Sequence, residues 1–208
     1  MQKRIYLSIG FILAFGIWTV LLGLVDVQAI GPNGSSVGFA TLNGWFHESI
    51  GVCFLLYTIT DWLGLVPIAV ALAFAGLGVC QWIKRKSLLK VDRSLFVLGA
   101  FYIAVIIAYI FFEMVVINYR PVLINGYLET SYPSSTTMLV TCVMPTAIMQ
   151  LNSRIKNKTI KKCVICIISA FIAFMVIGRL VSGVHWFSDI IGGILLSAGL
   201  VTAYKTFA

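Results

Sequence analysis

The sequence contains few charged residues and few side chains that bind metals. Of its 208 residues only 11% are charged, with 7 acidic residues and 2 histidines. No group of histidine, cysteine, aspartate or glutamate has the spacing of a metal site, so we expect no metal and no other cofactor. The 5 cysteines are scattered. The one close pair, Cys163 and Cys166, opens an apolar stretch, where two small hydrophobic residues are the simpler interpretation.

Internal repeats and low-complexity segments are absent as well, and most of the chain consists of long apolar runs. Hydrophobic residues make up 60% of the sequence, and the mean hydropathy is +1.01. The runs are continuous rather than alternating, which is typical of membrane helices and not of a β-barrel. The length fits about six spans of about 20 residues. We therefore predict an all-α, polytopic membrane helix bundle with spans near 5–25, 63–83, 95–117, 135–151, 161–180 and 187–206.

The least regular stretch lies between the first two predicted spans. A turn at residues 31–36 is followed by Val37–Tyr57, in which Trp45, His47 and Glu48 interrupt the apolar residues. This pattern favours an interfacial or re-entrant helix rather than a full span. We expect residues 1–208 to form a single membrane-embedded domain.

The basic residues are distributed unevenly across the predicted topology. The net charge of +8 would suit a nucleic-acid partner, but the positive charges lie beside the spans instead of forming one binding patch. Every lysine and arginine except Arg120 and Arg179 falls on one side of the predicted membrane, which the positive-inside rule makes cytoplasmic together with both termini. The two exceptional arginines fall on the outer side with His47 and His185. The partners we expect are membrane lipids and no nucleic acid.

One outer segment, residues 178–189, combines a guanidinium, an imidazole and a carboxylate. Arg179 has the planar donor fork that suits phosphate oxygens. His185 and Asp189 are four residues apart, so on a helix they share a face, and the acid can hold the imidazole in one tautomer. A packed polar pair between helices is the alternative. Ionisable residues beside a membrane usually have a function, which favours a phosphate-handling site.

Two further outer segments could contribute to the same site. The first, residues 113–121, begins with Glu113 and ends with Arg120-Pro121. The second begins a predicted helix with Ser134, Ser135 and Thr136, where Ser134 is the expected N-cap. Amides at a helix start bind anions, so we take these three residues as candidate phosphate ligands. They could equally be capping residues alone.

Together the three segments resemble the signature motifs of the type 2 phosphatidic acid phosphatase (PAP2) superfamily. The family pattern is Lys-x6-Arg-Pro, then Pro-Ser-Gly-His, then Ser-Arg-x5-His-x3-Asp, and its integral membrane branch has a six-helix layout. The resemblance implies that His185 is the nucleophile that forms a phosphohistidine and that Asp189 orients it. It also implies that Arg120 and Arg179 clamp the transferred phosphoryl group and that Ser134 hydrogen-bonds it.

The sequence departs from the family pattern at two chemically important positions. Glu113 replaces the family's lysine, and Thr136 replaces the histidine that protonates the leaving group. A threonine hydroxyl is not an effective acid near neutral pH. His47, or Glu113 if it is buried, could act as a substitute acid or contact the head group.

The resemblance therefore implies a membrane lipid phosphatase with its active site on the outer face, and a bacterial plasma membrane is the family-level expectation. A polyprenyl diphosphate is the favoured substrate, because its leaving group is itself a phosphate with a second pKa of about 6 and needs little protonation. The alternatives are a lipid phosphotransferase and a catalytically impaired protein that binds or transports a lipid phosphate.

Overall fold

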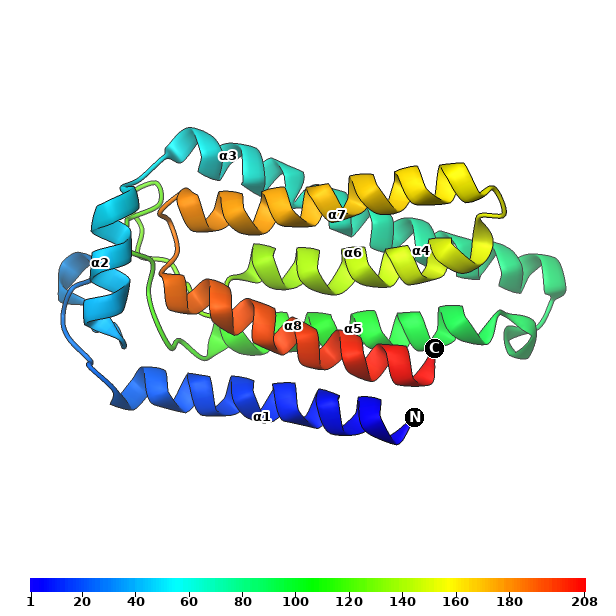
Figure 1. Ribbon diagram of the computed structural model, residues 1–208, viewed down its shortest axis with the longest axis horizontal. Coiled ribbons are helices and arrows are strands. Elements are labelled where there is room, and N and C mark those ends of the chain that lie inside the picture. Colours follow the sequence, from blue (N-terminus) through cyan, green and yellow to red (C-terminus); the bar gives the residue numbers. More distant parts are fainter.

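The computed structural model describes residues 1–208, which form eight α-helices and two short 3-10 turns (Figure 1). The elements are α1 (Gln2–Leu24), η1 (Pro32–Gly34), α2 (Ala40–Ile50), α3 (Phe54–Leu63), α4 (Leu65–Arg85), η2 (Leu88–Lys90), α5 (Arg93–Met114), α6 (Ser135–Arg154), α7 (Lys158–Val181) and α8 (Phe187–Phe207).

Five helical stretches are long and apolar enough to cross a membrane: α1, α3 together with α4 (Phe54–Arg85), α5, α7 and α8. Few side chains of α1, α3 with α4, α5 and α7 are buried inside the protein, as lipid-facing helices require, whereas half of α8 is buried. The predicted all-α membrane bundle is confirmed at this level, and the chain is a multi-pass membrane protein.

The remaining long helix, α6, lies in the middle of the bundle and contacts α4, α5, α7 and α8 (Figure 1). Its lower apolar content comes from buried polar residues that bond to neighbouring helices. Thr146 lies 3.3 Å from the Tyr102 hydroxyl of α5, and the Gln150 amide donates to the Tyr204 hydroxyl of α8 at 2.6 Å. Because α6 is enclosed by protein, it can carry polar residues that a lipid-facing helix could not.

The segment between the first two spans differs from the predicted single interfacial helix. The helix of Val37–Tyr57 breaks at Gly51, where φ is +70°, a conformation that glycine adopts without strain. The residues before the break form α2, which packs across the start of α8, and those after it form α3. α3 continues almost directly into α4, so the second apolar stretch begins at Phe54, not near residue 63.

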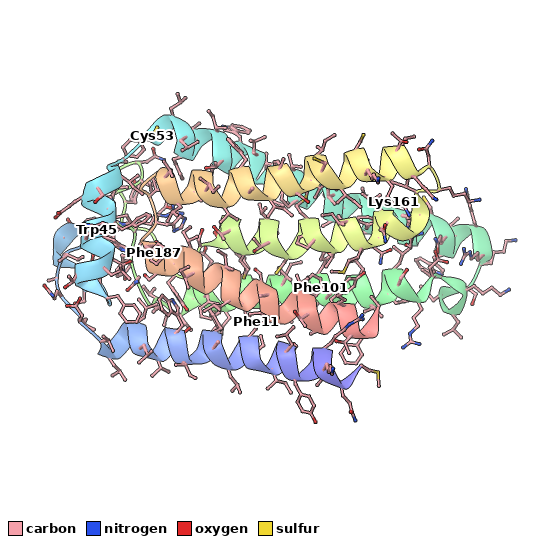
Figure 2. The ribbon with its side chains drawn as sticks, in the orientation of Figure 1. Phe11, Trp45, Cys53, Phe101, Lys161 and Phe187 are labelled. Atoms are coloured by element: carbon pink, nitrogen blue, oxygen red, sulfur yellow. The ribbon has the colours of Figure 1, made fainter.

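The two ends of the bundle differ in composition. Both termini and the α4–α5 and α6–α7 connections lie at one end, where Figure 2 labels Lys161. At the other end α2 lies across the helix tips, near Trp45 and Phe187 in Figure 2. The loops before α6 and α8 are at this second end, beneath α2. Arg120, Arg179, His47 and His185 are all among these elements and loops.

Candidate active site

The loop between α5 and α6, residues 115–134, folds back on itself and supplies several residues to the site. The Arg120 N–H donates to the Glu129 carbonyl at 3.0 Å, and the Ser131 N–H donates to the Asn118 carbonyl at 2.9 Å. These bonds set the two arms of the loop side by side. Asn118, Arg120 and Ser131 are therefore held together although up to 13 positions separate them.

The tip of α7 and the start of α8 supply the other half. Gly183, with φ of +68°, makes the turn between them, and a Cβ atom there would meet the Gly51 carbonyl oxygen at 2.0 Å. A bond of 3.0 Å from the Cys53 N–H to the Ser182 carbonyl joins the same two loops. The break between α2 and α3 thus packs directly on the turn that carries His185.

His185 is the centre of the arrangement, and its side chain is buried, with the residue 3% exposed. Its Nε2 atom lies 3.2 Å from Nη2 of Arg179 and 3.4 Å from Nη1 of Arg120. A guanidinium only donates hydrogen bonds, so Nε2 faces both groups as an acceptor. The structure brings the four residues Arg120, Arg179, His185 and Asp189 together.

The link from His185 to Asp189 runs through a residue that the sequence analysis does not single out. His185 Nδ1 and the nearest Asp189 oxygen are 4.0 Å apart. Between them lies the Ser131 hydroxyl, 2.9 Å from Nδ1 and 2.5 Å from Asp189 Oδ2. Four-residue spacing predicts proximity on a helix, but His185 precedes the helix, and the gap is filled by a serine from another loop.

This geometry assigns the histidine tautomer. An ionised carboxylate accepts only, so the single Ser131 hydroxyl proton goes to Asp189. The hydroxyl oxygen must then accept from Nδ1–H of His185. The proton is on Nδ1, and Nε2 keeps a free lone pair, as its two donor neighbours also require.

Asp189 is fully buried, and further donors surround its carboxylate. The Trp186 N–H donates to Oδ2 at 3.0 Å, and the Asn118 amide donates to Oδ1 at 3.3 Å. Behind it, Asn43 of α2 accepts from the Ser188 N–H at 3.1 Å. These bonds satisfy a carboxylate that would otherwise be costly to bury, and they fix its orientation.

Each arginine has a second, acidic partner on its outer side. Arg120 Nε lies 3.1 Å from Glu129 as an ion pair without hydrogen-bond geometry, and Arg179 Nη1 lies 3.6 Å from Asp61. The Tyr57 ring is 5.0 Å from the Arg179 guanidinium carbon and 5.9 Å from that of Arg120. Sequence reasoning missed all three partners. Asp61, just before a predicted span, and Glu129, in a predicted outer loop, were detectable only as two of the seven acidic residues.

Arg179 has unused hydrogen-bonding capacity. The residue is 1% exposed, yet its Nε and Nη1 atoms have no hydrogen-bond partner. Buried unpaired donors are rare in folded proteins and commonly mark a ligand position. An anion with several acceptor oxygens would satisfy them.

The pKa of His185 is lowered well below its ordinary value of 6.5, first by burial and then by the charges of Arg120 and Arg179. The ring is therefore neutral at physiological pH. Together with the assigned tautomer, this leaves the Nε2 lone pair available for nucleophilic attack, and the two cations beside it could neutralise an anionic group there.

Ser134, Ser135 and Thr136 do not all approach His185. Ser134 occupies the N-cap position of α6, but its hydroxyl donates to the Thr137 hydroxyl at 3.0 Å instead of accepting from the helix backbone. Ser135 lines a small pocket that His185 also lines. Thr136 lies toward Gly64, at the junction of α3 and α4.

The two candidate substitute acids occupy different surroundings. Glu113 lines the pocket at His185 and accepts from the Thr130 hydroxyl at 2.9 Å, but it is exposed, so the burial that the sequence argument needs is absent. His47 is half-buried on α2, and its ring is 5.5 Å from the Trp186 ring. Burial lowers the pKa of His47, so it is mostly neutral at neutral pH.

The pocket at His185 opens between α5 and α6. Its walls are Tyr109, Phe112 and Glu113 of α5, Ser135 and Met138 of α6, and the loop residues Thr130–Pro133. Tyr109 is exposed on the apolar flank of α5, and it lines the same small pocket as the buried imidazole. No group of three or more histidine, cysteine, aspartate or glutamate side chains is placed to hold a metal ion.

Comparisons with known proteins give a family and a fold. The model of the PAP2 superfamily matches residues 68–208, a range that includes all three motifs. The crystal structure of a transmembrane PAP2 type phosphatidylglycerolphosphate phosphatase from Bacillus subtilis is similar, with a TM-score of 0.56 and 20% sequence identity. The match covers 97% of this chain and 96% of that one, and at this identity it shows the fold. No curated protein matches the sequence.

Proposed function

Since the chain belongs to the PAP2 superfamily, which confirms the resemblance of its motifs, we propose that it is a membrane lipid phosphatase acting through a phosphohistidine on His185. One observation carries the proposal. His185 Nε2 faces two arginines, while Nδ1 is tied through Ser131 to Asp189. A lipid-phosphate binder would need the arginines but not a relay that prepares the imidazole for attack.

In the first step Nε2 attacks phosphorus, the N–P bond forms, and the bond to the leaving oxygen breaks. The ring becomes positively charged, and Asp189 stabilises that charge through the Ser131 hydroxyl. Arg120 and Arg179 turn from Nε2 to the equatorial phosphoryl oxygens and neutralise the charge that develops there. Water then attacks the phosphohistidine, which releases inorganic phosphate and restores the imidazole.

The ion pairs with Glu129 and Asp61 help to position the two arginines beside His185. Asp61 is exposed and Glu129 is partly exposed, so solvent screens their attraction for the guanidiniums. A buried dianionic phosphoryl group competes well with such partners, and the unpaired donors of Arg179 support this exchange. The Ser134 hydroxyl is already bonded to Thr137, so in this proposal Ser134 acts through its backbone at the start of α6 and not through a free hydroxyl.

The leaving group determines which substrate suits the site. Thr136 supplies no acid, Glu113 is exposed at the pocket rim, and the pKa of His47 is lowered. A diphosphate, whose leaving group is a lipid monophosphate, needs the least protonation. We therefore favour a polyprenyl diphosphate over a phosphate monoester. Phosphatidylglycerolphosphate is the monoester to compare, because the structurally similar protein is a phosphatidylglycerolphosphate phosphatase.

We further propose that α6 is a sixth membrane crossing and that residues 1–208 form one PAP2-like domain. The basic end would face the cytoplasm with both termini, and the His185 end would face outward at a bacterial plasma membrane. The position of almost all lysines and arginines at one end supports this orientation.

The decisive experiment measures phosphate release by detergent-purified protein from a polyprenyl diphosphate, phosphatidylglycerolphosphate and phosphatidic acid, with His185→Ala as the control. We expect the diphosphate to be the fastest substrate and the variant to be inactive. Faster release from the monoesters would reject the diphosphate preference. Transfer of phosphate to an added acceptor lipid would indicate a phosphotransferase, and equal activity of wild type and His185→Ala would reject the enzyme.

A further inference from the structure

A second hollow lies far from His185, between α4 and α5. This groove has a free volume of about 440 Å³. Its lining is almost wholly apolar and includes Phe74, Val79 and Trp82 of α4, Leu95 and Ile103 of α5, and Val91 between the helices. It reaches the end of the bundle where η2 joins the two helices.

The groove is shaped in part by two glycines. Gly78 on α4 and Gly99 on α5 both line it, and a Cβ atom built on either would meet no other atom within 4 Å. The space is therefore not filled by any neighbouring side chain. Its apolar walls, from Phe74 to Trp82 on α4 and from Leu95 to Ile103 on α5, suit a flexible hydrocarbon chain.

The mouth of the groove is strongly basic. The residues from 84 to 93 include five basic side chains and one acid, Asp92. That acid is already bonded to Arg85 at 3.0 Å and to Arg154 at 3.3 Å. The other basic side chains have no ion-pair partner: Lys84, Lys86, Lys90 and Arg93.

The 3-10 turn η2, within this basic segment, exposes apolar residues next to the charges. Leu89, between Leu88 and Lys90 in η2, is 95% exposed, and Leu88 is 51% exposed. Exposed leucines beside lysines are typical of a segment that dips into a membrane surface, with the charges at head-group level. The groove mouth therefore lies where phospholipid head groups begin.

From the groove, the four free cations and the exposed leucines, we propose that this site binds an anionic phospholipid, with one acyl chain between α4 and α5 and the phosphate at Lys86 and Lys90. A lysine cluster at a helix end attracts anionic head groups in this way. A second copy of the chain fits less well, because two such basic mouths would repel each other. The site is at the opposite end from His185, so the lipid is not the substrate.

The test is lipid retention by the purified full-length protein, measured by native mass spectrometry after titration with phosphatidylglycerol or phosphatidylcholine. The wild-type protein should retain phosphatidylglycerol about tenfold more strongly than phosphatidylcholine. Gly78→Leu and Gly99→Leu fill the groove and should lower that retention, whereas Gly76→Leu, on the same helix but outside the groove, should not. Equal retention of the two lipids would overturn the proposal.

A charge variant gives an independent arm should groove filling disturb the fold. Lys86→Glu with Lys90→Glu should abolish the preference for the anionic lipid. The matched control, Lys158→Glu with Lys161→Glu, makes the same change of charge in the first turn of α7, at the same end of the bundle, and should preserve the preference for the anionic lipid. Thermal unfolding of each variant shows that it is folded. An equal loss of the preference for the anionic lipid in both double variants would also refute the assignment. So would finding the groove occupied by a protein segment.

Discussion

The two ends of this bundle use positive charge in opposite ways. At the His185 end two arginines are buried, and each contacts the imidazole, an acid and the Tyr57 ring. At the other end the cations are mostly exposed, and most have no ion-pair partner. Buried, oriented charge costs desolvation and can stabilise a particular transition state, whereas exposed charge acts collectively and can be exchanged. Substitutions of the same type at the two ends should therefore have very different effects.

The largest contrast is expected between two aspartates. Asp189→Asn removes the charge that stabilises the His185 imidazolium and should lower phosphate release by about a thousandfold or more. Asp92→Asn breaks ion pairs at the basic end and should leave turnover unchanged. Steady-state kinetics of both variants make the comparison. Similar losses in the two would show that the effect reports folding and not catalysis.

Arginine substitutions at the two ends should differ nearly as much in their effect on activity. Arg120→Gln or Arg179→Gln removes a cation from the phosphoryl position and should reduce kcat/KM by about 100- to 1000-fold. Arg85→Gln, at the opposite end, is the control and should keep wild-type activity. A wild-type rate in either site variant would exclude that arginine from the clamp.

Ser131→Ala removes the hydroxyl between His185 and Asp189 and should lower kcat by about ten- to a hundredfold, by analogy with the partners that orient metal-bound histidines. Ser131→Thr keeps the hydroxyl and should recover most of the loss. A purely structural role for Ser131 would instead change KM or stability with kcat intact.

The pH dependence gives a smaller but more specific signal. The pKa of His185 is held well below 6.5 by burial, Arg120 and Arg179, and the proposed mechanism uses the neutral ring as the nucleophile. Activity should therefore persist as the pH falls through 6.5. Removing a nearby positive charge makes protonation easier, so Arg179→Gln should move the acidic limb of the kcat/KM profile to higher pH. A limb that stays in place would contradict the electrostatic assignment.

The smallest effect is expected for the ion pairs at the basic end. Arg85→Gln or Arg154→Gln should cost about 0–1 kcal/mol of unfolding free energy, because these contacts are partly exposed. Thermal unfolding in detergent measures the change. A loss of several kcal/mol would mean that Asp92 and its partners form a rigid core element.

The sequence predicts the helices and the motif residues, but it predicts less well the breaks between helices and the residues that contact the motif side chains. Continuous hydropathy located the apolar stretches, and α6 was identified by its helix start although its buried threonines lower its hydropathy. The break at Gly51 was missed, because a glycine within an apolar run does not reveal a change of direction. Motif spacing placed His185 near Asp189 but could not show the 4.0 Å gap. Ser131 fills that gap from a loop whose fold depends on tertiary contacts.

The contact of both arginines with Nε2 has a consequence for the cycle as a whole. The imidazole lone pair faces the same guanidinium donors that the phosphoryl oxygens take in the proposed reaction, so ring and anion compete for one set of hydrogens. The orthophosphate that the proposed second step releases is also such an anion. The geometry therefore predicts product inhibition that is competitive with the lipid and is relieved as phosphate is diluted.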